Sequence, residues 1–521
     1  MNDPMSTNDM FAWIAFSLAI SSSLLLILLL HSRLSRRNQT NSSRLPPGPP
    51  GWPLIGYLLN LSYQPHKTFV HLQKKYGPVF MLRLGAMNVL VIASEDAAME
   101  LFKHHDQAFS NRLLGEVLKL TGDEYGPTPL LSPSGSIWRM NRRLYAAIFS
   151  RTTLKKSLGR RRQFVDQMMQ WISVEEKEGR SVEIRHLSFV ALTNLFGNLF
   201  FSKDLMDFKS ATGNELYHLI KEIGVLSTKP NVADFFPWLR KLDPQNLGNR
   251  MNKARNAFEN IIDEFVKERK GRDIVSPNNN EEKDFLDMLM DFEGSGKDEP
   301  KKMLDKHINA FMMEMMMGGT DTTVSTIEWV MTEVVRNPEV MRKAKDEIAQ
   351  VVGYNRKIEE SDTGSLPYLG AVIKEAMRLN PVAPFLIPRA TVEETEFMGY
   401  IVPKDTAVFV NIWGIGRDSA SWDDPFSFNP DRFLGNTTDY RGRHYRFLPF
   451  GAGRRICPGL PMVNQILPIV VGSLLQSFDW TLENGVTPES IDMNEKLEMS
   501  LKKSTPLRIK PRATALQTSV E

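Results

Sequence analysis

The chain has 521 residues, of which 42% are hydrophobic and 24% are charged, so it has the composition of an ordinary globular protein with enough apolar residues for a sizeable core. Its formal net charge of +3 at pH 7 gives no basis for nucleic-acid binding, which needs a concentrated basic stripe. A single cysteine, Cys457, excludes an intramolecular disulfide and favours a reducing compartment over the extracellular space.

An uncharged apolar run at residues 11–30 predicts an N-terminal transmembrane helix. Twenty helical residues span about 30 Å, the thickness of a bilayer's hydrocarbon core. No Lys or Arg precedes the run, whereas several arginines follow it, so the positive-inside rule leaves the rest of the chain in the cytosol. We therefore expect a membrane anchor over residues 1–32. The alternative is a cleaved signal peptide, which would have basic residues in front and a small-residue cleavage site behind.

Residues 33–55 join several arginines to the proline-rich run Leu45–Gly51 and predict a stiff, extended hinge, because proline fixes φ and prevents a helix. Beyond it we expect one domain over residues 56–510 and a polar tail over residues 511–521. The pattern in the domain is mostly helical, so the expected fold class is mainly α with small β-sheets. The short strand-like runs lie at residues 79–84, 89–93 and 406–410.

A proline-free stretch from Asp305 to Arg336 predicts a helix of about 48 Å that crosses the domain, with a stop at Asn337-Pro338. Within it lies the run Gly318–Thr323, Gly-Gly-Thr-Asp-Thr-Thr. Two glycines weaken a helix by about 1 kcal/mol each, and Thr hydroxyls that bond back to carbonyls bend it. On its own this run indicates no more than an irregular helix.

The segment Phe450–Gly459 holds the only cysteine and three glycines, which allow tight turns and a close approach of the backbone to a flat ligand. Cys457 opens an apolar helical run, with Pro458 in its first turn. A sulfur at a helix N-terminus beside Arg454 and Arg455 is where a thiolate is stabilised. A thiolate donates electron density to haem iron and favours O–O cleavage.

This segment matches Phe-x-x-Gly-x-Arg-x-Cys-x-Gly at every fixed position and so resembles the haem-binding signature of the cytochrome P-450 family. The resemblance implies haem b (iron protoporphyrin IX), with Cys457 as the axial ligand of its iron and Arg455 at a propionate. Phe450, Gly451 and Gly459 would then belong to the cofactor-binding loop.

Other marks of the family occur in the right order. Trp138 and Arg142, in the segment Trp-Arg-Met-Asn-Arg, resemble a helix motif that meets the propionates, and Arg389 matches a further propionate contact. In the run Gly318–Thr323, the resemblance implies that Thr322 hydrogen-bonds iron-bound dioxygen and that Asp321 relays protons, because O–O cleavage needs protons on the distal oxygen.

Glu375 and Arg378 form the family's Glu-x-x-Arg motif on one helix face. On its own such a pair is usually a surface ion pair worth little. The resemblance implies a buried pair joined by Arg432 of the segment Phe428–Phe433, and therefore a structural role for the three residues, with haem loss as the expected consequence of breaking it.

The chain offers no complete dinucleotide fingerprint and no Walker sequence, so the electrons must come from a partner. The resemblance implies NADPH-cytochrome P-450 reductase, docked on the cysteine side. Six basic residues cluster in the sequence near that side: Arg441, Arg443, His444, Arg446, Arg454 and Arg455. The cluster either attracts an acidic partner or is ordinary solvated surface.

The general pattern is closest to plant microsomal enzymes of the geraniol hydroxylase and iridoid oxidase group, and it implies a single-pass protein of the endoplasmic reticulum membrane with a cytosolic catalytic domain. The expected substrate is a small apolar metabolite, a monoterpenoid or iridoid first, hydroxylated or oxidised in successive steps. Alternatives are hydroxylation or phenol coupling of alkaloids or phenolic compounds, an oxygen-independent haem-thiolate isomerase or dehydratase, and a membrane haem protein for electron transfer.

The expected pocket walls are residues 112–128, 311–317, 382–387 and 497–501, and residues 232–239 border a lipid-side access channel or pack in the core.

Overall fold

A computed structural model of the chain describes residue 22 and residues 44–119, 130–207, 211–275, 283–294, 299–483 and 485–514. The fold is mainly α-helical with four small sheets, which confirms the expected fold class. The α-helices are α2 (Pro65–Tyr76), α3 (Glu95–Met99), α5 (Ser136–Ile148), α6 (Arg151–Lys156), α7 (Leu158–Lys177), α8 (Ile184–Phe201), α9 (Ala211–Thr228), α10 (Val232–Phe235), α11 (Leu247–Val275), α12 (Phe285–Met290), α13 (Asp305–Arg336), α14 (Pro338–Val351), α15 (Pro367–Leu379), α16 (Ile412–Ile415) and α17 (Leu460–Ser477). Shorter 3-10 or π turns are η2 (Leu58–Asn60), η3 (Glu100–His104), η4 (Pro237–Leu242), η5 (Glu360–Ser365), η6 (Pro430–Phe433) and η7 (Gly453–Arg455).

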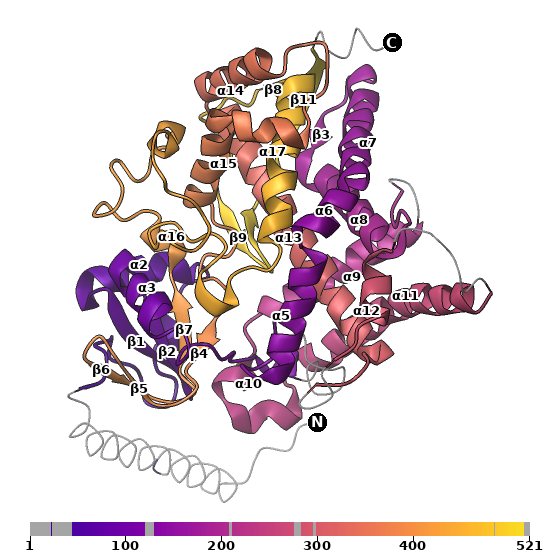
Figure 1. The fold of residues 1–521 in the computed structure, drawn as a ribbon. Coiled ribbons are helices and arrows are strands. Elements are labelled where there is room, and N and C mark those ends of the chain that lie inside the picture. Colours follow the sequence, from indigo (N-terminus) through magenta and orange to yellow (C-terminus); the bar gives the residue numbers. More distant parts are fainter. Residues whose placement is uncertain are drawn as a thin grey trace, which may run out of the picture.

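The largest sheet has the strand order β1-β2-β7-β4 and lies to one side of the helices (Figure 1). β1 and β2 form an antiparallel hairpin, β7 runs parallel to β2, and β4 is antiparallel to β7. The strands are β1 (Val79–Leu84), β2 (Met87–Ile92), β3 (Val182–Glu183), β4 (Arg389–Ala390), β5 (Thr395–Phe397), β6 (Tyr400–Val402), β7 (Ala407–Val410), β8 (Phe478–Leu482), β9 (Glu495–Leu497), β10 (Leu501–Lys503) and β11 (Arg508–Ala513). All three strand-like runs seen in the sequence are therefore strands.

The helix α13 has the bounds that the sequence predicts, Asp305 and Arg336, and Pro338 begins the next helix. It packs against α8, α11, α15 and α17 and runs through the middle of the helical part (Figure 1). Most of its residues are buried, because a helix enclosed on several sides has to be apolar nearly all round. This position brings the run Gly318–Thr323 to the centre of the domain.

Part of the proline-rich run in the expected hinge packs on the sheet. The Met81 N–H of β1 donates to the Pro47 carbonyl at 2.8 Å, and Gly56 bridges to Leu84 at the other end of the same strand. β1 is an edge strand with backbone groups to satisfy, and these contacts satisfy them. Pro47, which lies in the expected hinge, thus contacts the sheet of the domain.

The C-terminal boundary moves as well. Strand β11 continues to Ala513 and pairs with β8 as far as Ala513 opposite Phe478, so three residues of the expected tail belong to a sheet. Pro511 is tolerated because β3 covers only the first two residues of β11, which leaves the other edge open at the proline.

The expected transmembrane helix at residues 11–30 lies outside the described residues, except for Ser22. Among the described residues, α17 alone is long and apolar enough to cross a bilayer, and 67% of that stretch is buried inside the domain. We therefore regard α17 as a core helix.

Candidate active site

A cavity in the centre of the domain lies between α13, α5, the segment after α15 and the loop that precedes α17. It encloses about 1670 Å³ of space not filled by atoms, its open mouth included. Most of its wall is apolar, with a few convergent polar groups, which is the usual constitution of a small-molecule site. The apolar lining includes Leu192, Phe196, Met315, Val382, Leu386 and Ile466.

Cys457 lines this cavity one turn before α17 begins. Its N–H donates to the Phe450 carbonyl at 3.0 Å, which closes the loop between the two residues. Gly451 adopts φ +71°, a conformation that favours glycine, and Gly459 leaves room beside the sulfur. Phe450, Gly451 and Gly459 all line the cavity, as does Cys457 itself.

The cysteine is partly accessible because it faces the cavity, yet it sits deep within the protein. Burial raises the pKa of its thiol, while the backbone N–H groups of Gly459 and Leu460 and the charge of Arg142 oppose that rise. The expected influence of Arg454 and Arg455 is not what acts here: Arg454 turns to Asp106, and Arg455 stacks on a tryptophan. Coordination to a metal cation deprotonates a thiol outright and so overrides this effect of burial.

Four arginines converge on the cavity from separate parts of the chain: Arg112, Arg142, Arg389 and Arg455. Burial, and then repulsion from Arg455 and Arg389, holds the pKa of Arg112 well below its usual value. Burial and repulsion from Arg389 and Arg142 likewise lower the pKa of Arg455 to about 10. Like charges gathered in a buried site are costly unless anions neutralise them, so the cluster suits an anionic ligand.

The arginines are oriented by backbone carbonyls. Arg142 donates to Ile456 O at 2.8 Å, next to the cysteine. Arg389 pairs with Asp106 at 2.6 Å and donates to Ala452 O at 2.8 Å. Arg455 donates to Ser110 O and Ser132 O. Arg112 donates to Leu130 O, Ile387 O and Pro388 O, so each of the four guanidinium groups is held at the cavity wall.

Trp138 adds an unsatisfied donor to this group. It lines the cavity under the guanidinium of Arg455, 4.8 Å from its ring centre. Its indole Nε1 is buried and has no hydrogen-bond partner among the described residues. An orphaned buried donor is costly, and a carboxylate of a bound ligand would satisfy it.

The α13 side of the cavity carries Thr322, whose hydroxyl donates to the Gly318 carbonyl at 2.6 Å. This is the back-bonding that the sequence predicts. Gly319 is required for packing, because a Cβ there would overlap the ring of Phe196. The helix therefore presents a Thr hydroxyl and a glycine surface to the cavity.

Asp321 is not among the described residues that line the cavity. Its carboxylate accepts from the Ser500 hydroxyl at 2.6 Å and pairs with Lys502 at 3.4 Å, on the side of β10. The structure thus separates the two members of the expected acid–alcohol pair: Thr322 faces the cavity and Asp321 faces the β9–β10 hairpin.

Glu375, Arg378 and Arg432 meet in the structure. Glu375 bonds Arg378 at 2.7 Å and Arg432 at 2.9 Å, and the side chains of the Glu375–Arg378 pair are fully buried. Arg378 also donates to Gly416, Pro425 and Ser427 carbonyls, so the cluster ties α15 to the segment that precedes the cysteine loop.

The cytochrome P450 family model matches residues 46–511. The chain belongs to the cytochrome P450 family. Iridoid oxidase of Catharanthus roseus is 41% identical over 504 residues, which is 95% of this chain and 97% of the relative. Geraniol 8-hydroxylase of the same plant is 40% identical, covering 92% and 95%. Cytochrome P450 76A2 of Solanum melongena is 43% identical, also covering 92% and 95%.

This cytochrome P450 is therefore a monooxygenase that works with haem iron, dioxygen and electrons from a redox partner. The cavity fits the cofactor in three respects: a cysteine at a helix start, an arginine cluster able to neutralise two propionates, and an orphaned indole donor beside that cluster. Arg112 is part of this cluster but belongs to no motif in the sequence, where it is only the first residue of the expected pocket wall 112–128.

The pocket walls expected for this cytochrome P450 are found in part. Four residues of the 382–387 segment line the cavity, and in the described segment 311–317 the lining residues are Glu314 and Met315, so one of the five methionines faces the cavity. Residues 497–501 are not among the described residues that line it, although Leu501 N donates to the carbonyl of the lining residue Val382.

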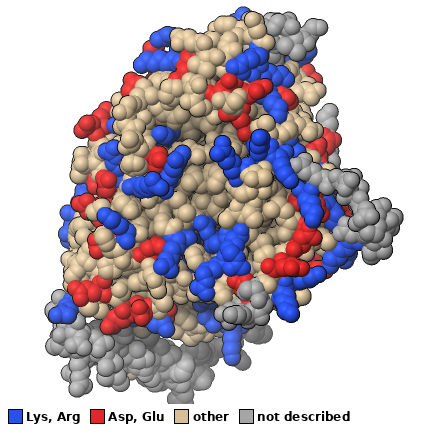
Figure 2. All heavy atoms as spheres, in the orientation of Figure 1, with Lys and Arg blue, Asp and Glu red and all other residues tan. Residues whose placement is uncertain are grey.

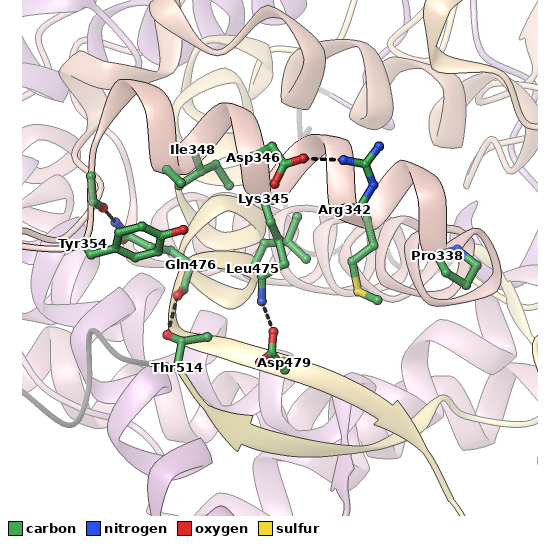
Figure 3. A pocket seen from close by; sticks show the side chains of 13 residues that line it. Pro338, Arg342, Lys345, Asp346, Ile348, Tyr354, Leu475, Gln476, Asp479 and Thr514 are labelled. Carbon is green, nitrogen blue, oxygen red and sulfur yellow. Dashed lines mark hydrogen bonds and ion pairs between the residues drawn. The ribbon is translucent and has the colours of Figure 1, made fainter.

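A second hollow lies between α14, the end of α17 and the start of β8 (Figure 3). Lys345 pairs with Asp479 across it, and Arg342 pairs with Asp346 at its rim. It shares no lining residue with the cysteine cavity and offers neither a thiol nor converging arginines. The chemistry of this cytochrome P450 therefore belongs to the central cavity.

Proposed function

We propose that the chain is a haem b-thiolate monooxygenase that inserts one oxygen atom into a small apolar plant metabolite, a monoterpenoid or iridoid. The observation that carries the proposal is the single cysteine in the wall of an apolar cavity, with Thr322 on another wall and four arginines at the side. This arrangement supports an iron ligand, a site for a dianionic macrocycle and a hydroxyl near the substrate.

Cys457 would bind the haem iron, and Trp138 and the four arginines would bind the two propionates. Guanidinium–carboxylate pairs are strong and directional, and here they would also relieve the repulsion among the arginines. When bound, haem supplies the activation of dioxygen with electrons delivered by a partner. Glu375, Arg378 and Arg432 would support the cysteine loop from outside, through α15.

Thr322 would hold a proton at Oγ1, from which it reaches the reacting oxygen, and Asp321 would supply protons to it. Because the Asp321 carboxylate is bound to Ser500 and Lys502, proton transfer to Thr322 requires rotation of that side chain or a water between the two groups. The apolar wall keeps bulk water from competing with an apolar substrate.

The substrate class rests on the apolar lining and on the names of the relatives, two of which act on geraniol or an iridoid. Residues 382–387 and Met315 would contact the substrate. Residues 232–239 would lie at a lipid-side entrance: Trp238 is 65% exposed, and the Ala86 N–H donates to Phe235 O, which fixes this segment beside the β1–β2 turn.

The redox partner would be NADPH-cytochrome P-450 reductase, and the protein would be anchored in the endoplasmic reticulum membrane by residues 11–30. On the face drawn in Figure 2, Lys and Arg side chains gather around a largely uncharged centre, which suits an acidic partner. Of the basic residues near the cysteine, Arg441, Arg443 and Arg454 are exposed and available for docking, whereas Arg455 lines the cavity and Arg446 stacks on Trp422.

The test is a microsomal preparation with reductase and NADPH, given a panel of terpenoids, alkaloids and phenolic compounds and analysed by mass spectrometry. We expect a Soret band shifted to long wavelength in the reduced carbon monoxide adduct, and an oxygenated product from a monoterpenoid that incorporates ¹⁸O from labelled dioxygen. A haem-containing protein that converts no monoterpenoid but converts a phenolic or alkaloid would overturn the substrate assignment and keep the reaction class.

A further inference from the structure

Asp106 lies beside the arginine cluster of the cavity, although it is not among the described residues that line the cavity itself. It follows the turn η3, and its Oδ1 pairs with the guanidinium of Arg389 at 2.6 Å. The side chain of Asp106 is 13% exposed and that of Arg389 is 5% exposed, so solvent screens this pair only in part. The charge of Asp106 therefore acts directly on one of the four cavity arginines.

Arg389 is held by this carboxylate, by a backbone carbonyl and by an aromatic ring. Its Nη2 donates to the Ala452 carbonyl at 2.8 Å, and its Cζ lies 4.8 Å from the centre of the Phe102 ring. Burial lowers the pKa of Arg389, whereas the charge and the hydrogen bond of Asp106 oppose that effect. Asp106 thus stabilises the charged form of Arg389 and fixes the direction of its guanidinium.

Asp106 also contacts the loop that carries the cysteine. Its Oδ2 accepts a hydrogen bond from Arg454 N at 3.0 Å and lies 3.6 Å from Nε of the same residue. Gly453 adopts φ +66°, and a Cβ there would overlap the Asp106 carboxylate, so a glycine leaves the room that this contact needs. Because the Arg454 side chain is 49% exposed, Asp106 joins a cavity arginine to the protein surface.

The charges around the cavity match a dianion. Four arginines carry one positive charge each, and two carboxylates, Asp106 and Glu314, act on them. These six side chains together carry a net charge of +2, equal and opposite to that of two propionates. Without Asp106, one positive charge would stay uncompensated in a buried site after the propionates bind.

We propose that Asp106 is a positioning residue that holds Arg389 for a haem propionate, offsets part of its charge and so lowers the reduction potential of the haem iron. Positive charge nearby favours the gain of an electron, and negative charge opposes it. Hydrogen bonds and charges outside the ligands themselves are among the means by which a protein sets such a potential. The inference rests on the proposed function, in which the same arginines bind the propionates.

The test compares wild-type holoenzyme with Asp106→Asn, which keeps the size of the side chain and removes its charge. The haem reduction potential is measured by spectroelectrochemical titration of the Soret band, without a redox partner. One unit charge in a partly buried site changes such an equilibrium by roughly 3- to 10-fold. We therefore expect the ferrous form to be favoured by that factor, a positive shift of about 30 to 60 mV at about 59 mV per tenfold.

Asp439→Asn is the matched control. Asp439 likewise accepts from the N–H of an arginine, Arg441, at 3.0 Å and lies 3.7 Å from its side chain, but that arginine is 68% exposed and is not among the described lining residues. The control should keep the wild-type potential. If Asp106→Asn also keeps it, or shifts it to a more negative value, Asp106 only ties its segment to the cysteine loop and the inference is wrong.

Where Asp106→Asn does not hold haem, Asp106→Glu decides, because it keeps the charge and changes the length of the side chain. Wild-type haem content and potential in Asp106→Glu support the inference, since a charged group of the wrong length then serves where a neutral group of the right length does not. Loss of haem from both variants, or a shifted potential in Asp106→Glu, overturns it. The proposed function fails separately: a wild-type protein without the long-wavelength Soret band of the reduced carbon monoxide adduct refutes haem-thiolate ligation itself.

Discussion

Glu375→Gln removes the negative charge that pairs with two guanidinium groups, those of Arg378 and Arg432, and keeps the size of the side chain. In the structure, Glu375 accepts four hydrogen bonds: two from Arg378 at 2.7 and 2.8 Å, one from Arg432 at 2.9 Å and one from Asn429 N at 2.9 Å. The side chains of Glu375 and Arg378 are 0% exposed, so solvent cannot compensate for the lost charge.

Leaving a buried charge without its partner costs about 3–5 kcal/mol, which is a large part of the roughly 5–15 kcal/mol that stabilises a typical domain. We therefore expect Glu375→Gln to lower the urea midpoint of unfolding strongly and to reduce the fraction of chain that holds haem, because the cluster supports the segment before the cysteine loop. Unfolding is followed by circular dichroism and haem content by the reduced carbon monoxide spectrum.

The matched control is Glu339→Gln on α14, which removes a carboxylate that also pairs with an arginine three residues on. Both side chains of that pair are exposed, at 65% and 60%, so water replaces the lost partner. The control should keep the wild-type midpoint and haem content. A Glu375→Gln protein that behaved like the control would refute the assignment of a supporting role to the buried cluster.

The remaining predictions concern the cavity and the N-terminal part of the domain. Cys457→Ser should abolish the long-wavelength Soret band of the reduced carbon monoxide adduct; an unchanged band would remove Cys457 as the iron ligand. Thr322→Ala should retain haem but release hydrogen peroxide in place of product, measured as product formed per NADPH consumed, and undiminished coupling would count against its role. Burial raises the pKa of Glu495, but the hydrogen bonds and charges of His66 and Lys67 outweigh it and lower that pKa to about 2. The stabilisation from this pair is therefore complete above pH about 4.5 and lost as the pH falls towards 2. Glu495→Gln should have a lower urea midpoint of unfolding than wild type at pH 7, and its midpoint should change less over that acid range.

Features that depend on neighbours in the chain were predictable. The bounds of α13 follow from a proline-free run and a following Asn-Pro, and the structure has the same bounds. The cysteine loop was predictable in part: its glycines allow the turn, but α17 begins at Leu460 with Pro461 in its first turn, so the expected start at Cys457 and Pro458 is wrong. Glu375 and Arg378 share a helix face at i,i+3 spacing, so their pairing needed no knowledge of the fold, although their burial did.

Other features depended on contacts between distant segments. Asp321 and Thr322 are adjacent, yet Asp321 turns away because Ser500, just before β10, and Lys502 of β10 bind its carboxylate from 179 and 181 residues later. Pro47 belongs to the domain because an edge strand needs its carbonyl. No local sequence pattern predicts either contact.

The amino-acid sequence by itself determined the chemistry: one cysteine in a glycine-rich loop just before a helix, and a Gly- and Thr-bearing run in a long helix. Only the tertiary structure decided which polar groups share the cavity with that cysteine, including Arg112 and Glu314, which carry no motif of their own. The reason is physical. Local spacing sets turns, caps and helix faces, whereas the direction in which a side chain points is set by the segment packed against it, and that segment comes from elsewhere in the chain.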